Sequence, residues 1–326
     1  MSRPAQSRIA SRVPSRRSAA VAAVLAAWAL LAAAPEARAA EGASSHYLPG
    51  ATGDLLLAAP SQPGLTVANT VWVQSGDVGR AVLGGRARAG LELDLVLDLA
   101  AASYTFETPV LGAAYSVAAL IPFGRADLTA FAVGPAGRRF DRSGDRFDLS
   151  DAAFVPIQLN WTHGPFFFEA SETIIAPTGG YERGRAINLG RNYWSFDTNV
   201  AATWFDPEGG REISIAPGLM VNTENPSTDY RTGTEFHMDV TATQFLSQSF
   251  AVGLRGYWYQ QIEGDSGAGA RLGDFRSSSV GLGLGFMWTP AAAEGRLTVL
   301  GKWMHDLDAD NRFRSDYLSA TLAWKF

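Results

Sequence analysis

The chain has 326 residues, a formal net charge of −5 and no cysteine. The modest charge without a basic stripe argues against a nucleic-acid partner, and the lack of cysteine argues against a small disulfide-bonded scaffold. After residue 39 no stretch approaches the ~18 consecutive apolar residues of a membrane-spanning helix, which excludes a helical membrane protein.

The amino-terminus has the parts of a secretory signal. Several arginines precede the apolar run 19–34, and Ala37-Arg38-Ala39 follows as a cleavage site. We therefore expect residues 1–39 to be a signal peptide. Residues 40–64 contain several Gly and Pro residues, which break regular secondary structure and predict an irregular leader ahead of the first strand. The leader could be a periplasmic tail or a plug inside the following domain. We favour the plug, because its apolar residues would be poorly placed in water.

From residue 65 onward, apolar and polar side chains alternate in segments of strand length. The second segment is the clearest, because Leu91, Leu93, Leu95, Leu97 and Leu99 alternate with acidic residues. We expect these leucines to face lipid, and Glu92, Asp94 and Asp98 to face the lumen of a barrel. The third segment, 110–133, is unusually long. It contains Pro122 and Phe123, where the missing proline N–H predicts a bulge or kink.

The later segments repeat the alternation and end on an aromatic carboxy-terminus. Connections after odd-numbered strands are mostly long and those after even-numbered strands are short, including the long predicted loop 134–149. A soluble sandwich has no reason to segregate its loops in this way. The pattern predicts an all-β fold, a transmembrane antiparallel β-barrel over 65–326 with about 12 strands and both termini in the periplasm. Fourteen strands is the alternative, because the third segment could be split and the leader could add a strand. We expect strands at about 65–74, 91–99, 110–133, 152–162, 166–175, 193–205, 211–222, 235–243, 250–259, 280–288, 296–305 and 316–326.

Strand parity also predicts which side chains line the lumen. Aromatic groups along a satisfied polar wall would suit the passage of apolar solutes, although tyrosines could equally fill the lumen. The candidate ligand path consists of Trp72, Glu235, His237, Asp239, Arg255, Tyr257 and Tyr259. The four histidines have no partners at zinc-site spacing, and no motif indicates a cofactor. His237 and Asp239 share a face, but no recognisable motif links a serine to them, so we expect no enzyme activity.

Several loops and strand ends carry distinctive short sequence motifs. The sequence resembles the meta-pathway phenol-degradation family of outer-membrane proteins over essentially the whole mature chain. The motifs that carry the resemblance are HYLPGATGD from His46, GRNYW (190–194), NTEN (222–225), YWYQQ (257–261) and LGDF (272–275). The resemblance implies a barrel associated with aromatic catabolism and similar to the channels that admit long-chain fatty acids and toluene.

These observations favour a passive outer-membrane channel for hydrophobic or aromatic small molecules in a diderm bacterium. We expect a lateral opening at Pro122 and Phe123. The alternative is a non-conducting barrel whose surface loops bind a partner, and a barrel hydrolase is a third possibility. The expected partners are outer-membrane lipid and lipopolysaccharide, a small hydrophobic solute, and the barrel-insertion machinery, which would read Phe326.

Overall fold

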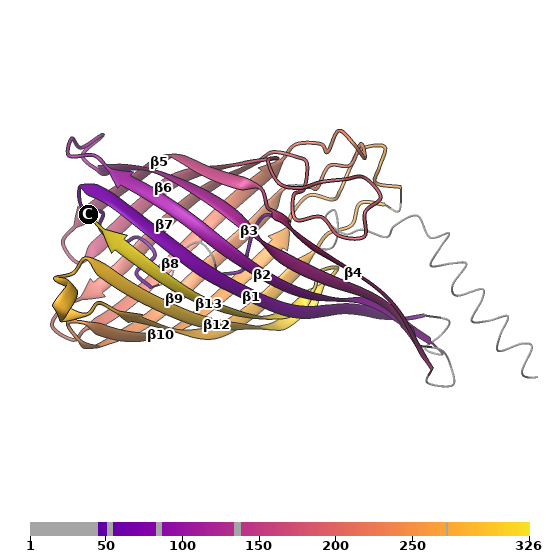
Figure 1. The fold of residues 1–326 in the computed structure, drawn as a ribbon. Helices are drawn as coiled ribbons and strands as arrows, with labels where there is room; N and C mark the ends of the chain where they lie inside the picture. Colours follow the sequence, from indigo (N-terminus) through magenta and orange to yellow (C-terminus); the bar gives the residue numbers. More distant parts are fainter. Residues whose placement is uncertain (1–44, 51–54, 83–86, 134–137, 272) are drawn as a thin grey trace, which may run out of the picture. The chain divides into compact units, whose positions relative to one another are not determined.

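The computed structural model describes residues 45–50, 55–82, 87–133, 138–271 and 273–326, and the expected signal peptide lies outside them. Apart from one 3₁₀ turn, the regular secondary structure of the described chain is β-strand (Figure 1). None of its helices is both long and apolar enough to span a bilayer. The elements are β1 (Gly64–Val82), β2 (Ala87–Thr105), β3 (Ala114–Val133), β4 (Arg139–Leu149), β5 (Ala152–His163), β6 (Phe166–Ala176), β7 (Ser195–Asp206), β8 (Arg211–Asn222), β9 (Glu235–Ser247), β10 (Phe250–Gln261), β11 (Ser278–Trp288), a 3₁₀ turn η1 (Ala291–Ala293), β12 (Leu297–Asp310) and β13 (Arg314–Lys325).

Antiparallel pairing closes the described strands into a barrel. β1 pairs with both β2 and β13, and the series continues around the wall until β5 pairs with β3 and β3 pairs with β2. Twelve of the described strands form this closed ring, and β4 is an extra strand that pairs with β3 alone. The structure therefore confirms the predicted all-β antiparallel barrel of about 12 strands.

β4 corrects the prediction of a loop over 134–149. β4 and β5 follow one another along the same edge of β3, where Phe123 pairs with Leu149 and Leu120 pairs with Ala153. β4 is thus a continuation of β5 beyond the membrane-facing part of the wall. The sequence of β4 did not predict a strand, because outside lipid both faces of a strand can carry charge and no apolar alternation is needed.

The step from β4 to β5 is a bulge opposite Pro122. Between the two pairs, the β3 side has two residues, 121 and 122, whereas the β4–β5 side has three, 150 to 152. The Ser150 N–H donates to the Pro122 carbonyl oxygen at 2.9 Å. On its other edge β3 pairs with β2 without a register shift from Ser116 to Val133. The irregularity expected at Pro122 therefore lies in the partner strand, while β3 runs straight through.

The leucines of β2 face the lumen, which corrects the expected orientation of this strand. Leu93 and Leu97 are buried and cluster with Trp72, whereas Val96 on the opposite face is 47% exposed. The acids point outward: Asp94 is exposed, Glu92 forms an exposed ion pair, and Asp98 accepts a hydrogen bond from Asn69 at 2.6 Å. The prediction was wrong because leucine and acid sets alternate equally well for either orientation.

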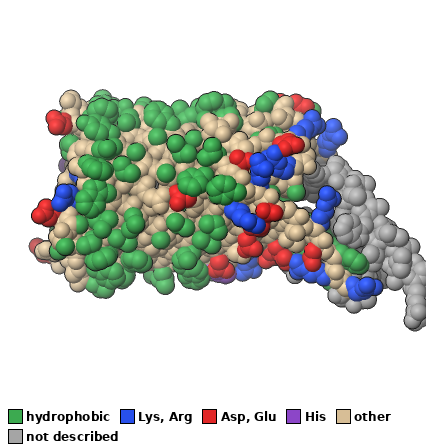
Figure 2. All heavy atoms as spheres, viewed as in Figure 1, with side chains coloured by type: hydrophobic (Ala, Val, Ile, Leu, Met, Phe, Trp, Pro, Cys, Tyr) green, Lys and Arg blue, Asp and Glu red, His purple; other side chains and the backbone are tan. Residues whose placement is uncertain are grey.

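The outer surface has an apolar belt and a charged end. Figure 2 shows hydrophobic side chains over most of the visible wall, with Lys, Arg, Asp and Glu gathered at the end opposite the carboxy-terminus. At that end β1 to β4 reach beyond the other strands (Figure 1). Exposed ion pairs such as Arg139 with Glu92 at 2.5 Å and Arg125 with Asp145 at 3.1 Å join these strands. The belt is the surface that a bilayer requires of a barrel.

Glycine on the inner face of β11 makes room for large side chains from its neighbours. A Cβ at Gly281 would lie 2.3 Å from the Tyr257 ring, and one at Gly283 would lie 2.6 Å from the Met304 sulfur. Both distances are shorter than a van der Waals contact. The glycines of β11 therefore let β10 and β12 fill the lumen with Tyr257 and Met304.

Candidate functional site

One side of the lumen is apolar. We call it the leucine wall, and it is made by inward side chains of β1, β2 and β3. The wall consists of Trp72, Leu91, Leu93, Leu95, Leu97, Leu99 and Ala126. Trp72, predicted to lie on the ligand path, is only 1% exposed and is paired with Leu97 across the strands. Ile187 and Leu189, from the connection between β6 and β7, pack against the same cluster.

The opposite side of the lumen is polar and comes mainly from β7 to β10. Its centre is His237, whose Nε2 lies 2.8 Å from Asp197 Oδ1. The other residues predicted on the path point into the lumen as strand parity required, and all of them are almost fully buried. They are Glu235, Asp239, Arg255, Tyr257 and Tyr259. The lumen is therefore amphipathic, with the leucine wall facing a wall rich in carboxylates and aromatic rings.

Leader residues make specific contacts with the polar wall, and sequence reasoning did not find them. The Tyr47 ring stacks on His237 at a centroid distance of 4.3 Å and on Tyr259 at 5.7 Å. Its hydroxyl donates to Asp239 Oδ2 at 3.2 Å. The Gly50 carbonyl accepts hydrogen bonds from Lys302 at 2.7 Å and from Arg255 at 3.2 Å. The described part of the leader is thus bound within the barrel interior.

A second contact region holds the leader at His46. Its Nε2 lies 2.9 Å from Asp151 Oδ2, and its Nδ1 lies 2.6 Å from the Ser195 hydroxyl. Asp151 also accepts backbone N–H groups from Gly179 at 2.8 Å and Arg191 at 2.6 Å. Asp151 belongs to the bulge opposite Pro122. One buried carboxylate therefore links the wall, the leader and the connection between β6 and β7.

The arrangement around His46 has the composition of a hydrolytic triad without its accessibility. Ser195 is fully buried, and its hydroxyl also lies 2.5 Å from Asn222 Oδ1. A serine nucleophile needs space in front of it for a carbonyl group. With the leader in place, these groups hold the chain rather than receive a substrate. Among the described residues, no three His, Cys, Asp or Glu side chains are arranged to hold a metal ion.

Acid should loosen the leader at His46. Burial lowers the pKa of His46 below its usual 6.5, even though the hydrogen bond to Asp151 opposes the change. Because the docked pKa is depressed, His46 favours docking above about pH 6.5, and this contribution is lost as the pH falls through the docked pKa. We expect hydrogen exchange of the His46–Gly50 amides, corrected for intrinsic rates, to be faster at pH 5 than at pH 8. His46→Gln should flatten this dependence, and an equal dependence in both proteins would contradict the assignment.

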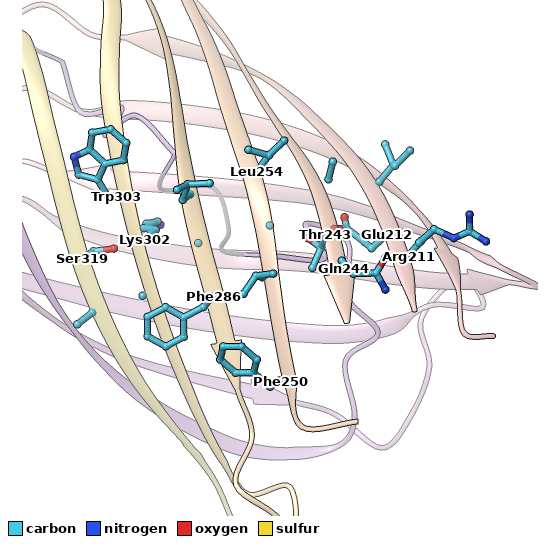
Figure 3. Close-up of a pocket in the computed structure, with 18 of the residues that line it drawn as sticks. Arg211, Glu212, Thr243, Gln244, Phe250, Leu254, Phe286, Lys302, Trp303 and Ser319 are labelled. Carbon is cyan, nitrogen blue, oxygen red and sulfur yellow. The ribbon is translucent and has the colours of Figure 1, made fainter. Parts of the chain in front are cut away.

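A pocket of about 1110 Å³ lies on the lipid-facing side of β7 to β13 (Figure 3). Most of the exposed side chains in its lining are apolar and point outward, among them Leu254, Leu284 and Trp303. Glu212 and Lys302 also line it, but their side chains are buried on the lumen side. The pocket is therefore a groove on the apolar outer surface and does not belong to the candidate ligand path.

The long connections interlock at the end of the barrel opposite the carboxy-terminus. The Asn225 side chain is fully buried and donates to the Tyr181 hydroxyl at 3.1 Å and to the Arg191 carbonyl at 3.2 Å. Tyr230 and Asp265 join the next pair of connections through a short hydrogen bond. A solute entering through this end would have to separate these contacts.

The solved structure of a known protein agrees with this architecture. An outer-membrane channel of the COG4313 group from Pseudomonas putida F1 has a similar structure, with a TM-score of 0.65 and 16% sequence identity, covering 86% of this chain and all of that one. The β-domain of the Bordetella autotransporter BrkA matches with a TM-score of 0.47 at 11% identity, over 81% of this chain and all of that one. No curated protein matches the sequence significantly.

The fold is that of an outer-membrane β-barrel, and a family model covers this barrel. It matches residues 74–322, which is most of the chain and nearly the whole barrel. The chain belongs to the protein family described as "Putative MetA-pathway of phenol degradation".

Proposed function

We propose that the protein is a passive channel that admits hydrophobic or aromatic small molecules across the outer membrane, with both termini facing the periplasm. The leucine wall is the observation that carries the proposal. A water-filled pore gains nothing from five leucines facing its interior, whereas an apolar solute gains roughly 25 cal/mol for each Å² of apolar surface removed from water. The family description, which refers to phenol degradation, supports an aromatic solute.

The leader acts as a plug in this proposal. Besides the Tyr47 and His46 contacts, the Leu57 N–H donates to Ser214 at 3.2 Å and the Ala58 N–H donates to Thr203 at 3.0 Å. Individual hydrogen bonds of this kind contribute only about 1 kcal/mol each. The leader can therefore be held firmly by many contacts and still be released when several are lost together.

The uptake of labelled toluene tests the proposal. Cells that lack the protein are compared with the same cells producing it, and folding in the outer membrane is checked by heat-modifiable gel migration. We expect faster entry into the producing cells. No difference in the presence of a folded barrel would contradict the channel and favour the non-conducting alternative.

A lateral opening at Pro122 and Phe123 would let the solute enter from the bilayer. Pro122 points into the lumen beside Leu99. Its carbonyl oxygen accepts the Ser150 N–H, but neither Ile121 nor Pro122 has a ladder partner on β4 or β5. The interlocked connections leave this seam as the easier route. We expect the double substitution Pro122→Val and Phe123→Thr, which supplies an N–H to the seam, to abolish uptake while leaving the barrel folded. Ile121→Val is the matched control, and unchanged uptake in the double variant would overturn the lateral route.

A non-conducting interaction barrel is the second candidate. It is favoured by the leader and the large side chains that occupy the lumen, among them Tyr257, Met304 and Tyr317. In that case the surface connections would carry the function, and the uptake comparison above would give no difference. A barrel hydrolase, the third reading, would require the leader to leave before Ser195 could meet a substrate.

A further inference from the structure

The Tyr47 side chain sits in a site that fits the chemistry of a phenol. Its ring is nearly parallel to two rings of the wall, with interplanar angles of 20° to His237 and 5° to Tyr259. Tyr257 adds a third ring at a centroid distance of 6.4 Å. These aromatic groups cover a six-membered ring, and offset stacking of this kind stabilises aromatic pairs beyond the area they bury.

The hydroxyl of Tyr47 is recognised separately from the ring. It donates to Asp239 Oδ2 at 3.2 Å and accepts the Gly50 N–H at 3.4 Å. Burial and the nearby Asp239 carboxylate raise the pKa of the Tyr47 phenol well above its usual value, so the hydroxyl keeps the proton that it donates. A hydrogen bond to a buried carboxylate discriminates strongly against a ring that lacks the hydroxyl.

The groups that make this site belong to the barrel and not to the leader. His237 and Asp239 are on β9, Tyr259 is on β10, and all three are fully buried. Asp197 on β7 fixes the His237 ring through the 2.8 Å contact to Nε2. Arg312, from the turn between β12 and β13, lies 4.2 Å from the centre of the Tyr259 ring and holds it from another side. The site is therefore built by the wall and would persist if the leader moved away.

We propose that Tyr47 is an internal substitute for the solute, and that a small phenol binds to His237, Tyr259 and Asp239 when the leader withdraws. The solute ring takes the place of the Tyr47 ring, and the solute hydroxyl donates to Asp239. Docking of the leader and binding of the phenol are then mutually exclusive, so a phenol in the lumen favours release of the plug. This inference rests on the proposed function for the withdrawal of the leader, but the binding itself can be measured without transport.

The test uses p-cresol, which is the tyrosine side chain as a free molecule, and the full mature chain in detergent micelles. Calorimetric titration compares the wild-type protein with Tyr47→Ala, which empties the site. We expect Tyr47→Ala to bind p-cresol at least about tenfold more tightly, because the ligand no longer competes with Tyr47. Leu57→Ala removes a leader side chain elsewhere and should bind p-cresol as the wild type does, which also corrects for partition into micelles.

Toluene and Asp239→Leu test the recognition of the hydroxyl. We expect Tyr47→Ala to bind toluene at least about tenfold more weakly than p-cresol, the factor that a hydrogen bond to a charged group contributes. Adding Asp239→Leu to Tyr47→Ala should abolish the preference. Equal affinities of wild type and Tyr47→Ala for p-cresol, or no preference over toluene, would overturn the inference.

A second measurement covers the case in which Tyr47→Ala fails to fold. p-Cresol added to the wild-type protein should accelerate hydrogen exchange of the His46–Gly50 amides, and toluene at the same concentration should accelerate it much less. Equal exchange with and without p-cresol would count against the inference. Normal cellular uptake of toluene together with absent p-cresol binding would leave the channel standing and remove only the phenol site. The reverse pattern would remove the channel and keep the site.

Discussion

Replacing Leu95 and Leu97 with glutamine should slow the uptake of toluene by about tenfold or more. Both side chains belong to the leucine wall, where Leu97 lies beside Trp72. Burial of a leucine side chain contributes ~1.5–3 kcal/mol, and each ~1.4 kcal/mol corresponds to a tenfold change in binding. Glutamine has a similar volume, but its polar amide would keep water molecules bound at the wall. The measurement is the initial rate of toluene entry into cells with equal amounts of folded barrel.

The matched control lies on the same strand and points the other way. Val96 faces outward and is 47% exposed, so Val96→Thr should leave toluene entry unchanged. If the Leu95→Gln, Leu97→Gln double variant folds and admits toluene at the wild-type rate, the leucine wall is not part of the route. Slowing by Val96→Thr as well would point to a general effect on the barrel.

Asp151→Ala should release the leader. The Asp151 carboxylate is 3% exposed and accepts hydrogen bonds from His46, Gly179 and Arg191. Although burial would raise it, these hydrogen bonds keep the pKa of Asp151 below its usual value, so the carboxylate is ionised at neutral pH. Removal of the carboxylate leaves buried donors without acceptors, at a cost of ~1–3 kcal/mol for each group. We expect hydrogen exchange of the His46–Gly50 amides to accelerate by about a hundredfold.

Asp148 provides the control for this variant. It lies three residues earlier on β4 and pairs with Arg146 at 2.9 Å in a partly exposed position. Asp148→Asn should therefore leave the exchange of the leader amides unchanged. If these amides remain protected from hydrogen exchange in a folded Asp151→Ala barrel, the Tyr47 and Gly50 contacts are sufficient to hold the leader without the contacts of Asp151 at the bulge.

The sequence by itself determined the barrel and half of its lumen. Alternation at a period of two predicted the strands, and the arrangement of long and short connections predicted a closed membrane wall. On β9 and β10 the polar and apolar sets differ clearly, so parity placed His237, Asp239 and Tyr259 inside correctly. On these two strands the face toward lipid carries apolar side chains and the face toward the lumen carries polar ones. The sequence pattern therefore shows which side chains point inward.

Only the tertiary structure decided the orientation of β2 and the position of the leader. Leucines and acids alternate on β2, and either set could face outward. The outward acids have polar partners, because Glu92 pairs with Arg139 in the charged extension and Asp98 accepts a hydrogen bond from Asn69. The leader contacts join residues far apart in the chain, such as His46 with Asp151 and Tyr47 with Asp239. Local periodicity carries no information about such pairs, because they depend on where closure of the barrel brings each strand. The apolar wall and the phenol-shaped site therefore became visible only when the strands were placed in register.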